Sequence, residues 1–194
     1  VLDRWVLRGV KIQQEIKNAN VPVALVDVAN VVATGIILRA VLGWIEGDLV
    51  LSVIALLMAF VVTQVLLSLV SYSRVIIFSK RNQGRDWQKE IASGNSALAL
   101  RYMGHIIGVS LAVTAASGLV IYNEENIFYS LMIWALAAID LVVVATFFSF
   151  IARKFILKGI DVVAEVDTQR NVGVATIEAV IFLSIGLLLI ALLT

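Results

Sequence analysis

The chain has 194 residues, of which 61% are hydrophobic and only 15% are charged. A soluble domain is about 45–50% apolar and about one quarter charged, so this composition excludes a water-soluble fold and predicts a polytopic membrane protein. The formal net charge of +1 argues against a nucleic-acid-binding domain. The absence of cysteine excludes thiol redox chemistry and thiolate metal ligands.

Five stretches are long enough to cross a bilayer as helices, because a spanning helix needs about 20 mostly apolar residues. Thirteen of the fifteen lysines and arginines lie before the first stretch, between the second and third, or between the fourth and fifth. Basic loops face the cytoplasm, so we expect these three segments inside the cell and the C-terminus outside. The five predicted spans are residues 22–44, 49–73, 97–121, 127–152 and 172–193.

The chain also resembles itself at a spacing of 75 residues. Residues 9–25 and 84–100 share seven of seventeen positions without a gap, and a third, weaker copy needs one extra residue before Asn171. The period is carried by three glycines and three glutamates, namely Gly9, Gly84, Gly159, Glu15, Glu90 and Glu165.

This period predicts an all-α bundle of two-helix units that point the same way across the membrane. The predicted units are residues 1–44, 49–122 and 127–194. Residues 1–8 align with residues 76–83, the end of a leading helix. We therefore expect the first unit to lack its leading helix, with some 25–30 residues or more preceding residue 1.

The repeated segment resembles a bacterial inner-membrane family called domain of unknown function 350. The matching residues are Glu15–Ile16, Asn20 and Ala24–Leu25; Glu90–Ile91, Asn95 and Ala99–Leu100; and Glu165–Val166, Asn171 and Ala175–Thr176. The resemblance covers essentially the whole chain. It implies location in the bacterial inner membrane and implies no particular activity.

The asparagines of this motif stand directly before apolar runs, where a helix N-cap would sit. We expect Asn20, Asn95 and Asn171 to cap the spans and the upstream glutamates, Glu15, Glu90 and Glu165, to shape the turn. The alternative is functional: the three glutamates gather around the pseudo-axis as an acidic ring that selects cations.

Small residues are expected to mark the helix-packing face, because helices in lipid approach closely where side chains are small. Gly104 and Gly108 form a GxxxG motif in the third span. The equivalent positions are Ala29 and Ala33 in the first unit and Val180 and Ser184 in the last.

Charged side chains inside spans are costly and are functional candidates by default. We expect Arg74 and Arg101 to extend to the cytoplasmic surface and Arg39 to the outer surface, near Trp44. Asp140 lies near the middle of its span, too deep to reach water in this way. A polar path for ions or protons would use Asp140, Gln64, His105, Asp27 and Glu178.

Three functions compete. The chain is a scaffold or subunit of a membrane complex, a channel or transporter that uses Asp140, or an intramembrane enzyme. No catalytic motif supports the enzyme, and the single histidine makes a poor metal site, so no catalytic residue, metal or cofactor is expected. The favoured hypothesis is the scaffold or subunit. Its expected partners are the lipid bilayer, further copies of the chain or other membrane subunits, and a cytoplasmic protein.

Overall fold

The computed structural model describes residues 6–194, and within this range every regular element is a helix. Five helices are long and apolar enough to cross a membrane, at the places where the sequence predicts spans. They are α3 (Val21–Trp44), α4 (Leu49–Arg81), α6 (Ser96–Ala115), α7 (Ile127–Ile156) and α8 (Val172–Leu193). The chain is therefore an all-α, multi-pass membrane protein.

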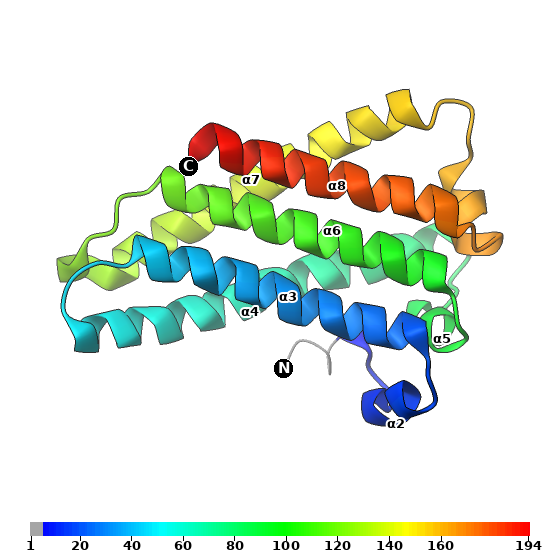
Figure 1. Ribbon diagram of the computed structural model, residues 1–194, viewed down its shortest axis with the longest axis horizontal. Helices are drawn as coiled ribbons and strands as arrows, with labels where there is room; N and C mark the ends of the chain where they lie inside the picture. The colour runs from blue at the N-terminus through cyan, green and yellow to red at the C-terminus, as the bar shows by residue number, and fades with distance from the viewer. Residues whose placement is uncertain (1–5) are drawn as a thin grey trace.

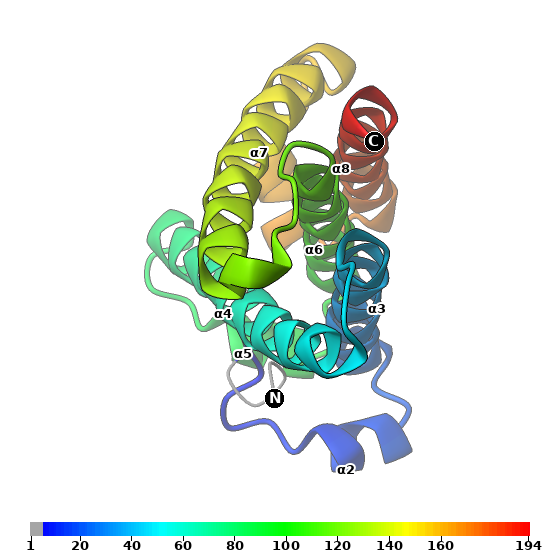
Figure 2. The same cartoon turned by 90° about the vertical axis from the view of Figure 1, so that its left-hand side faces the viewer.

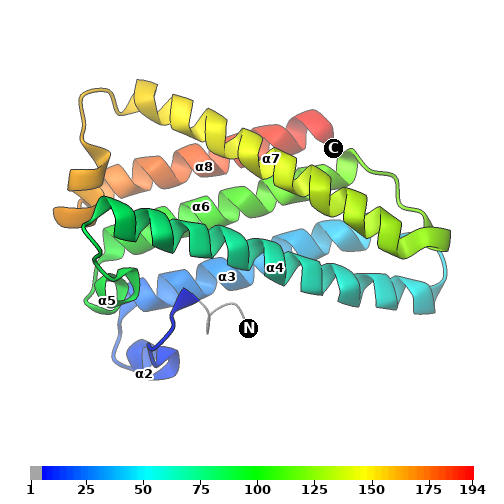
Figure 3. The same ribbon diagram turned by 180° about the vertical axis from the view of Figure 1, so that it is seen from behind.

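The long helices form two layers. Helices α3, α6 and α8 lie side by side in one layer (Figure 1), and α4 and α7 cross behind them in the other (Figure 3). Viewed from one end, α6 lies at the centre of the bundle (Figure 2). It is the most buried of the five, since it packs between α3 and α8 and against α7.

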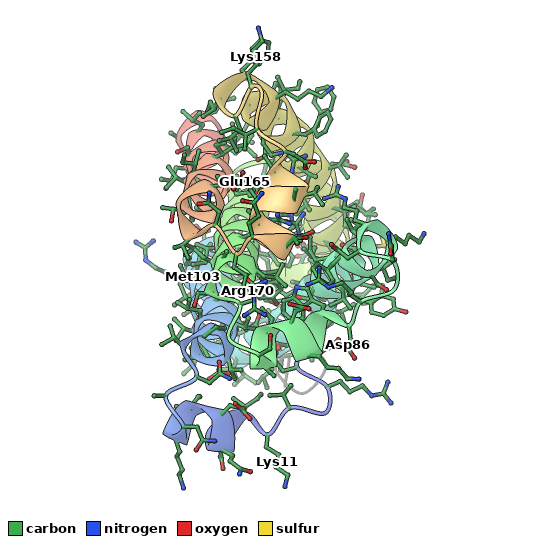
Figure 4. All side chains as sticks on the ribbon, turned by 90° about the vertical axis from the view of Figure 1, so that its right-hand side faces the viewer. Lys11, Asp86, Met103, Lys158, Glu165 and Arg170 are labelled. Atoms are coloured by element: carbon green, nitrogen blue, oxygen red, sulfur yellow. The ribbon has the colours of Figure 1, made fainter. Side chains whose placement is uncertain are left out.

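Short elements connect the long helices at both ends of the bundle. Three of them, α2 (Ile12–Lys17), α5 (Trp87–Ala92) and the π-helix η3 (Ala164–Thr168), lie at the same end, which we call the elbow end (Figures 1 and 4). The opposite end, which we call the hairpin end, holds the connections from α3 to α4 and from α6 to α7, and the C-terminus. It also holds the short helices η1 (Ala116–Gly118) and η2 (Glu124–Asn126).

The elbows share one backbone conformation at their glycines. Gly9, Gly84 and Gly159 have φ angles of 84°, 83° and 84°, in the left-handed region that favours glycine. The amide after each glycine donates to a carbonyl three residues earlier, over distances of 3.0, 3.1 and 3.1 Å. The repeat hypothesis predicts this agreement, and it predicts that all three glycines lie at one end of the bundle.

The extra residue of the third copy is accommodated as a π-helical turn. In η3 the amide of Gln169 donates to the carbonyl of Ala164, five residues earlier, at 2.9 Å. The equivalent elements α2 and α5 are ordinary α-helices. A π-turn lets a helix absorb one inserted residue without losing its register on either side. In this chain it also turns Asp167 into the interior, where the side chain is buried.

The unit boundaries remain a prediction. The alignment of residues 1–8 with residues 76–83 falls mostly on residues 1–5, which lie outside the described part of the chain. Of the other aligned residues, Val6 and Leu7 are buried against the bundle.

Glycines bring α6 and α8 into backbone contact. A methyl group built on Gly104 would lie 2.3 Å from the Cα of Ala179, and one on Gly108 would lie 2.6 Å from the carbonyl oxygen of Phe182. Ala29 and Ala33 are fully buried on α3. These four small residues lie in helix contacts, where the sequence places the packing face.

Ser184 is exposed on α8, so its predicted place on a packing face, within the chain or with a second copy, stays a prediction. The residues that α8 presents to the two glycines of α6 include Ala179 and Gly186. Helix α8 ends its layer, so the face equivalent to the glycine face of α6 has no further helix to pack on in the described chain.

Aromatic residues close the hairpin end. Trp44 stacks on Trp134 with ring centroids 6.1 Å apart and meets the ring of Tyr122 edge-on at 5.3 Å. Its indole N–H donates to the carbonyl of Val120. Burial, and after it the carboxylate of Glu124, raise the pKa of Tyr122. The stacked tryptophans set α3 and α7 at a common height.

Candidate functional site

Each elbow ends in an asparagine that caps the following long helix. The side-chain oxygens of Asn20, Asn95 and Asn171 accept hydrogen bonds from the amide three residues later, at 3.4, 3.0 and 3.2 Å. The backbone amide of each asparagine donates to the carbonyl of the motif glutamate. The motif thus ties every elbow to the helix that it leads into, as the N-cap pattern predicts.

The three motif glutamates make their closest contacts within the elbows. Glu15 accepts from the side chain of Asn20, and Glu165 accepts from that of Asn171, both at 2.8 Å. Glu90 instead pairs with Arg85 at 2.6 Å and reaches Arg170 of the third elbow at 3.6 Å. These bonds support the turn-shaping role. The acidic ring stays a prediction, and in this structure two of its members are tied to their own capping asparagines.

Neighbouring elbows also touch each other. The side-chain amide of Asn20 donates to the backbone carbonyl of Ala92 at 2.9 Å. The guanidinium of Arg170 donates to the hydroxyl of Ser93, also at 2.9 Å. Figure 4 looks onto this end and shows the elbows of Lys11, Asp86 and Glu165 as one row. The elbow end is therefore a connected surface.

Beneath this surface lies a buried group of charges centred on Arg101. Its guanidinium bonds Asp167 and Glu178, both at 2.8 Å, and donates to the carbonyl of Val162 at 3.1 Å. Arg101 is 7% exposed, and both carboxylates are 1% exposed. One arginine thus joins α6 to the third elbow and to α8.

The remaining carboxylate oxygens of this group have their own donors. Arg153 of α7 bonds the second oxygen of Glu178 at 3.0 Å. Asn82, at the end of α4, donates to the second oxygen of Asp167 at 2.8 Å. We call these five residues, Asn82, Arg101, Arg153, Asp167 and Glu178, the elbow cluster. It ties four of the long helices to the π-helical elbow.

The chemistry of the elbow cluster is that of a structural lock. Buried ion pairs gain little over apolar packing, but removing one partner leaves an uncompensated buried charge and costs about 3–5 kcal/mol. All four carboxylate oxygens of Asp167 and Glu178 have a donor at 3.0 Å or less. Neither acid is left free to act as a base or to bind a passing cation.

The residues predicted for a polar path are spread over the molecule. Glu178 belongs to the elbow cluster, and Asp27 is half-buried in the elbow half of α3. Gln64 donates to the hydroxyl of Thr34 at 3.2 Å, which links α4 to α3. These polar groups lie at helix contacts.

His105 and Asp140 lie in different surroundings. His105 is buried between α6 and α8, where its ring meets that of Phe182 edge-on at 4.7 Å. Asp140 is exposed on the outward side of α7, and no hydrogen bond or ion pair is formed by it within residues 6–194. The structure does not bring the two together, so the polar path is not assembled inside a single chain.

The prediction that Arg101 extends to the surface is wrong, because two buried carboxylates hold it inside. Arg74 also stays inside, with its guanidinium 5.6 Å from the ring centroid of Phe182. Sequence reasoning missed Asp167 and Asn82 altogether. The signal that points to Asp167 is the inserted residue of the third copy, since π-turns concentrate at functional or strained sites.

In the described part of the chain, no three histidine or acidic side chains are grouped so as to hold a metal ion. The elbow cluster contains guanidinium groups, those of Arg101 and Arg153, beside its two carboxylates.

Comparison with known proteins places the chain in a family. Residues 48–193 match the family model Domain of Unknown Function (DUF350). The match runs from the start of α4 almost to the end of α8 and covers most of the chain, so the protein belongs to the DUF350 family. The search of curated proteins and that of solved structures gave no match.

Proposed function

We propose that this DUF350 protein is a non-enzymatic subunit of a membrane assembly and that its membrane partners include further copies of the same chain. We place it in the bacterial inner membrane with the elbow end in the cytoplasm, where the basic residues of that end support the orientation. The elbow surface is then the face available to a cytoplasmic protein.

The observation that carries this proposal is a pair of opposite charges exposed in the spans. Asp140 on α7 and Arg39 on α3 are both exposed on helices that are otherwise apolar. Charged groups facing hydrocarbon cost roughly 2.5–3.5 kcal/mol or more each, so they normally face a partner. Arginine can bend toward the nearer surface, but the short side chain of aspartate cannot.

The two charges lie at the same depth. Trp44 and Trp134 stack, so they mark one height on α3 and α7. Arg39 lies five residues inward of Trp44, and Asp140 lies six residues inward of Trp134. At 1.5 Å per residue these offsets are about 7.5 Å and about 9 Å. The difference between the two depths is small enough for an arginine side chain to span.

Within residues 6–194 no ion pair joins the two charges, which lie on α3 in the front layer and on α7 in the back layer (Figures 1 to 3). They can pair between two copies that share one orientation in the membrane. Such a contact is head-to-tail, so it forms a ring if it closes and a row if it does not.

Cysteine cross-linking tests this arrangement, since the chain has no cysteine of its own. Leu42 and Leu136 each lie two residues inward of the stacked tryptophans, and Gly35 and Val143 each lie nine residues inward. All four are exposed. We expect L42C to form disulfides with L136C, and G35C with V143C, when both variants are co-expressed in membranes.

The control pairs L136C with L188C, a cysteine at an exposed position of α8 in the hairpin half of the bundle. Cross-linking of the control as strong as that of the two test pairs contradicts the proposed contact, as does the absence of disulfides in both test pairs.

Ion or proton translocation is the competing function, because a contact between copies would also surround Asp140 with protein. Purified protein in vesicles distinguishes the two. The subunit proposal expects ion and proton flux no greater than in empty vesicles. A flux that disappears in Asp140→Asn would favour the channel.

A further inference from the structure

We propose that a cavity at the elbow end binds a small anion through guanidinium groups. The cavity has a volume of about 20 Å³. It lies between α4, α5, α6 and the third elbow, and its polar lining consists of Arg74, Arg81, Arg101, Trp87, Tyr102 and Asp167. The proposal goes beyond the function proposed above and does not depend on self-association.

The charges around this cavity do not balance. The carboxylate oxygens of Asp167 are bonded to Arg101 and Asn82, and those of Glu178 are bonded to arginines of the elbow cluster. Arg74 and Arg81 also line the cavity, yet neither forms an ion pair or hydrogen bond with any residue in the range 6–194. Two guanidinium groups beside the cavity therefore have no carboxylate in direct contact within the described residues.

Arg74 and Arg81 both line the cavity because they lie on the same face of α4. They are seven residues apart on α4, which is two turns, so they lie on one face of the helix. Arg74 is held over the ring of Phe182, and Arg81 is exposed at the end of the helix. The first lies two turns inside the helix and the second is its last residue.

An anion supplies what these guanidinium groups lack, which is a negative charge and an acceptor for their hydrogen bonds. An uncompensated guanidinium away from bulk water is costly, and its planar fork of donors is suited to anions. To hold one water, a cavity needs about 10–15 Å³ of space that the centre of a water-sized sphere can occupy, which is the measure used for the volume above. The space therefore suits a single chloride ion, or one anionic oxygen of a lipid phosphate that reaches in from the headgroup layer.

Thermal unfolding of the full chain in a neutral detergent tests the site. Chloride is titrated against gluconate at constant ionic strength in one arm. In the other, phosphatidylglycerol is titrated against phosphatidylcholine in the micelles. A ligand that binds only the folded state raises Tm with its concentration. We expect wild-type Tm to rise in at least one arm, and Arg74→Gln to lose that rise.

Lys158→Gln is the matched control, because it removes one positive charge from an exposed position at the same end. It should keep the wild-type response. A response to chloride identifies a free anion as the ligand, and a response to phosphatidylglycerol alone identifies a headgroup phosphate. If Arg74→Gln does not fold, Arg81→Gln replaces it, since Arg81 is exposed. The proposal is overturned if neither arm shifts Tm, or if the arginine variants respond like the wild type.

Discussion

The chain places its intramembrane charges in two contrasting ways. Near the elbow end, Arg101, Asp167 and Glu178 are buried and bonded to each other at 2.8 Å. Elsewhere in the spans, Arg39 on α3 and Asp140 on α7 are exposed, and no ion pair joins them within residues 6–194. The first group is bonded within one chain, whereas the second forms no ion pair or hydrogen bond within residues 6–194. The inward charges connect elements of the fold, and the outward charges are the basis of the contact between copies that we propose.

The largest expected effect is the loss of an inward charge. Arg101→Gln leaves Asp167 and Glu178 without their shared guanidinium, so the free energy of unfolding should fall by about 3–5 kcal/mol. Denaturant titration in detergent micelles measures the change. Glu125→Gln, at an exposed position of the hairpin end, is the control and should be almost neutral. A loss below about 1 kcal/mol for Arg101→Gln would show that the elbow cluster is not a lock.

A smaller effect is expected where α6 meets α8. In Gly104→Ala the new methyl would lie 2.3 Å from backbone and side-chain atoms of Ala179, so the helices must separate. Overpacking of this kind costs about 1–3 kcal/mol. Gly35→Ala is the matched control, because nothing lies within 4 Å of its new methyl. There the better helix propensity of alanine should leave stability equal or slightly higher. Equal losses in both variants would contradict the close contact.

The caps come next. Asn171→Ala removes the bond to the amide of Val174 and leaves Glu165 without its side-chain donor. The expected loss is about 1 kcal/mol. Asn171→Ser keeps a capping oxygen and should recover most of this loss in the same titration. An alanine variant as stable as the wild type would show that the cap contributes nothing.

The smallest effect on the fold is expected at the outward charge. Asp140→Asn breaks no bond within residues 6–194, so the free energy of unfolding of the isolated chain should stay within about 0.5 kcal/mol of the wild type. The same variant should weaken self-association, measured by size-exclusion chromatography with light scattering. A large loss of stability in the monomer would place Asp140 among the inward charges.

Much of the fold could be predicted from the sequence, because hydropathy sets where helices can cross a membrane. The five spans and the three capping asparagines depend on local pattern alone, and the structure shows them where the pattern places them. The single inserted residue of the third copy was also visible in the sequence.

The elbow cluster could not be predicted, because it depends on how helices cross. Asp167 is buried within the π-helical turn, and Arg101 bonds two carboxylates from separate segments of the chain. The exposure of Ser184 has a related reason: equivalent sequence positions have equivalent neighbours within one chain only when each helix has a further helix beside it. The outward direction of Asp140 likewise becomes visible only after α7 is packed.

Charge reversal tests the central claim, that Arg39 and Asp140 pair between copies, most directly. In membranes carrying the L42C and L136C cysteines, Arg39→Asp alone and Asp140→Arg alone should each abolish the disulfide. The chain carrying both reversals should recover it, because each copy again meets an opposite charge. Recovery is the result that this account predicts. Cross-linking that survives either single reversal, or that stays lost in the double variant, would contradict it.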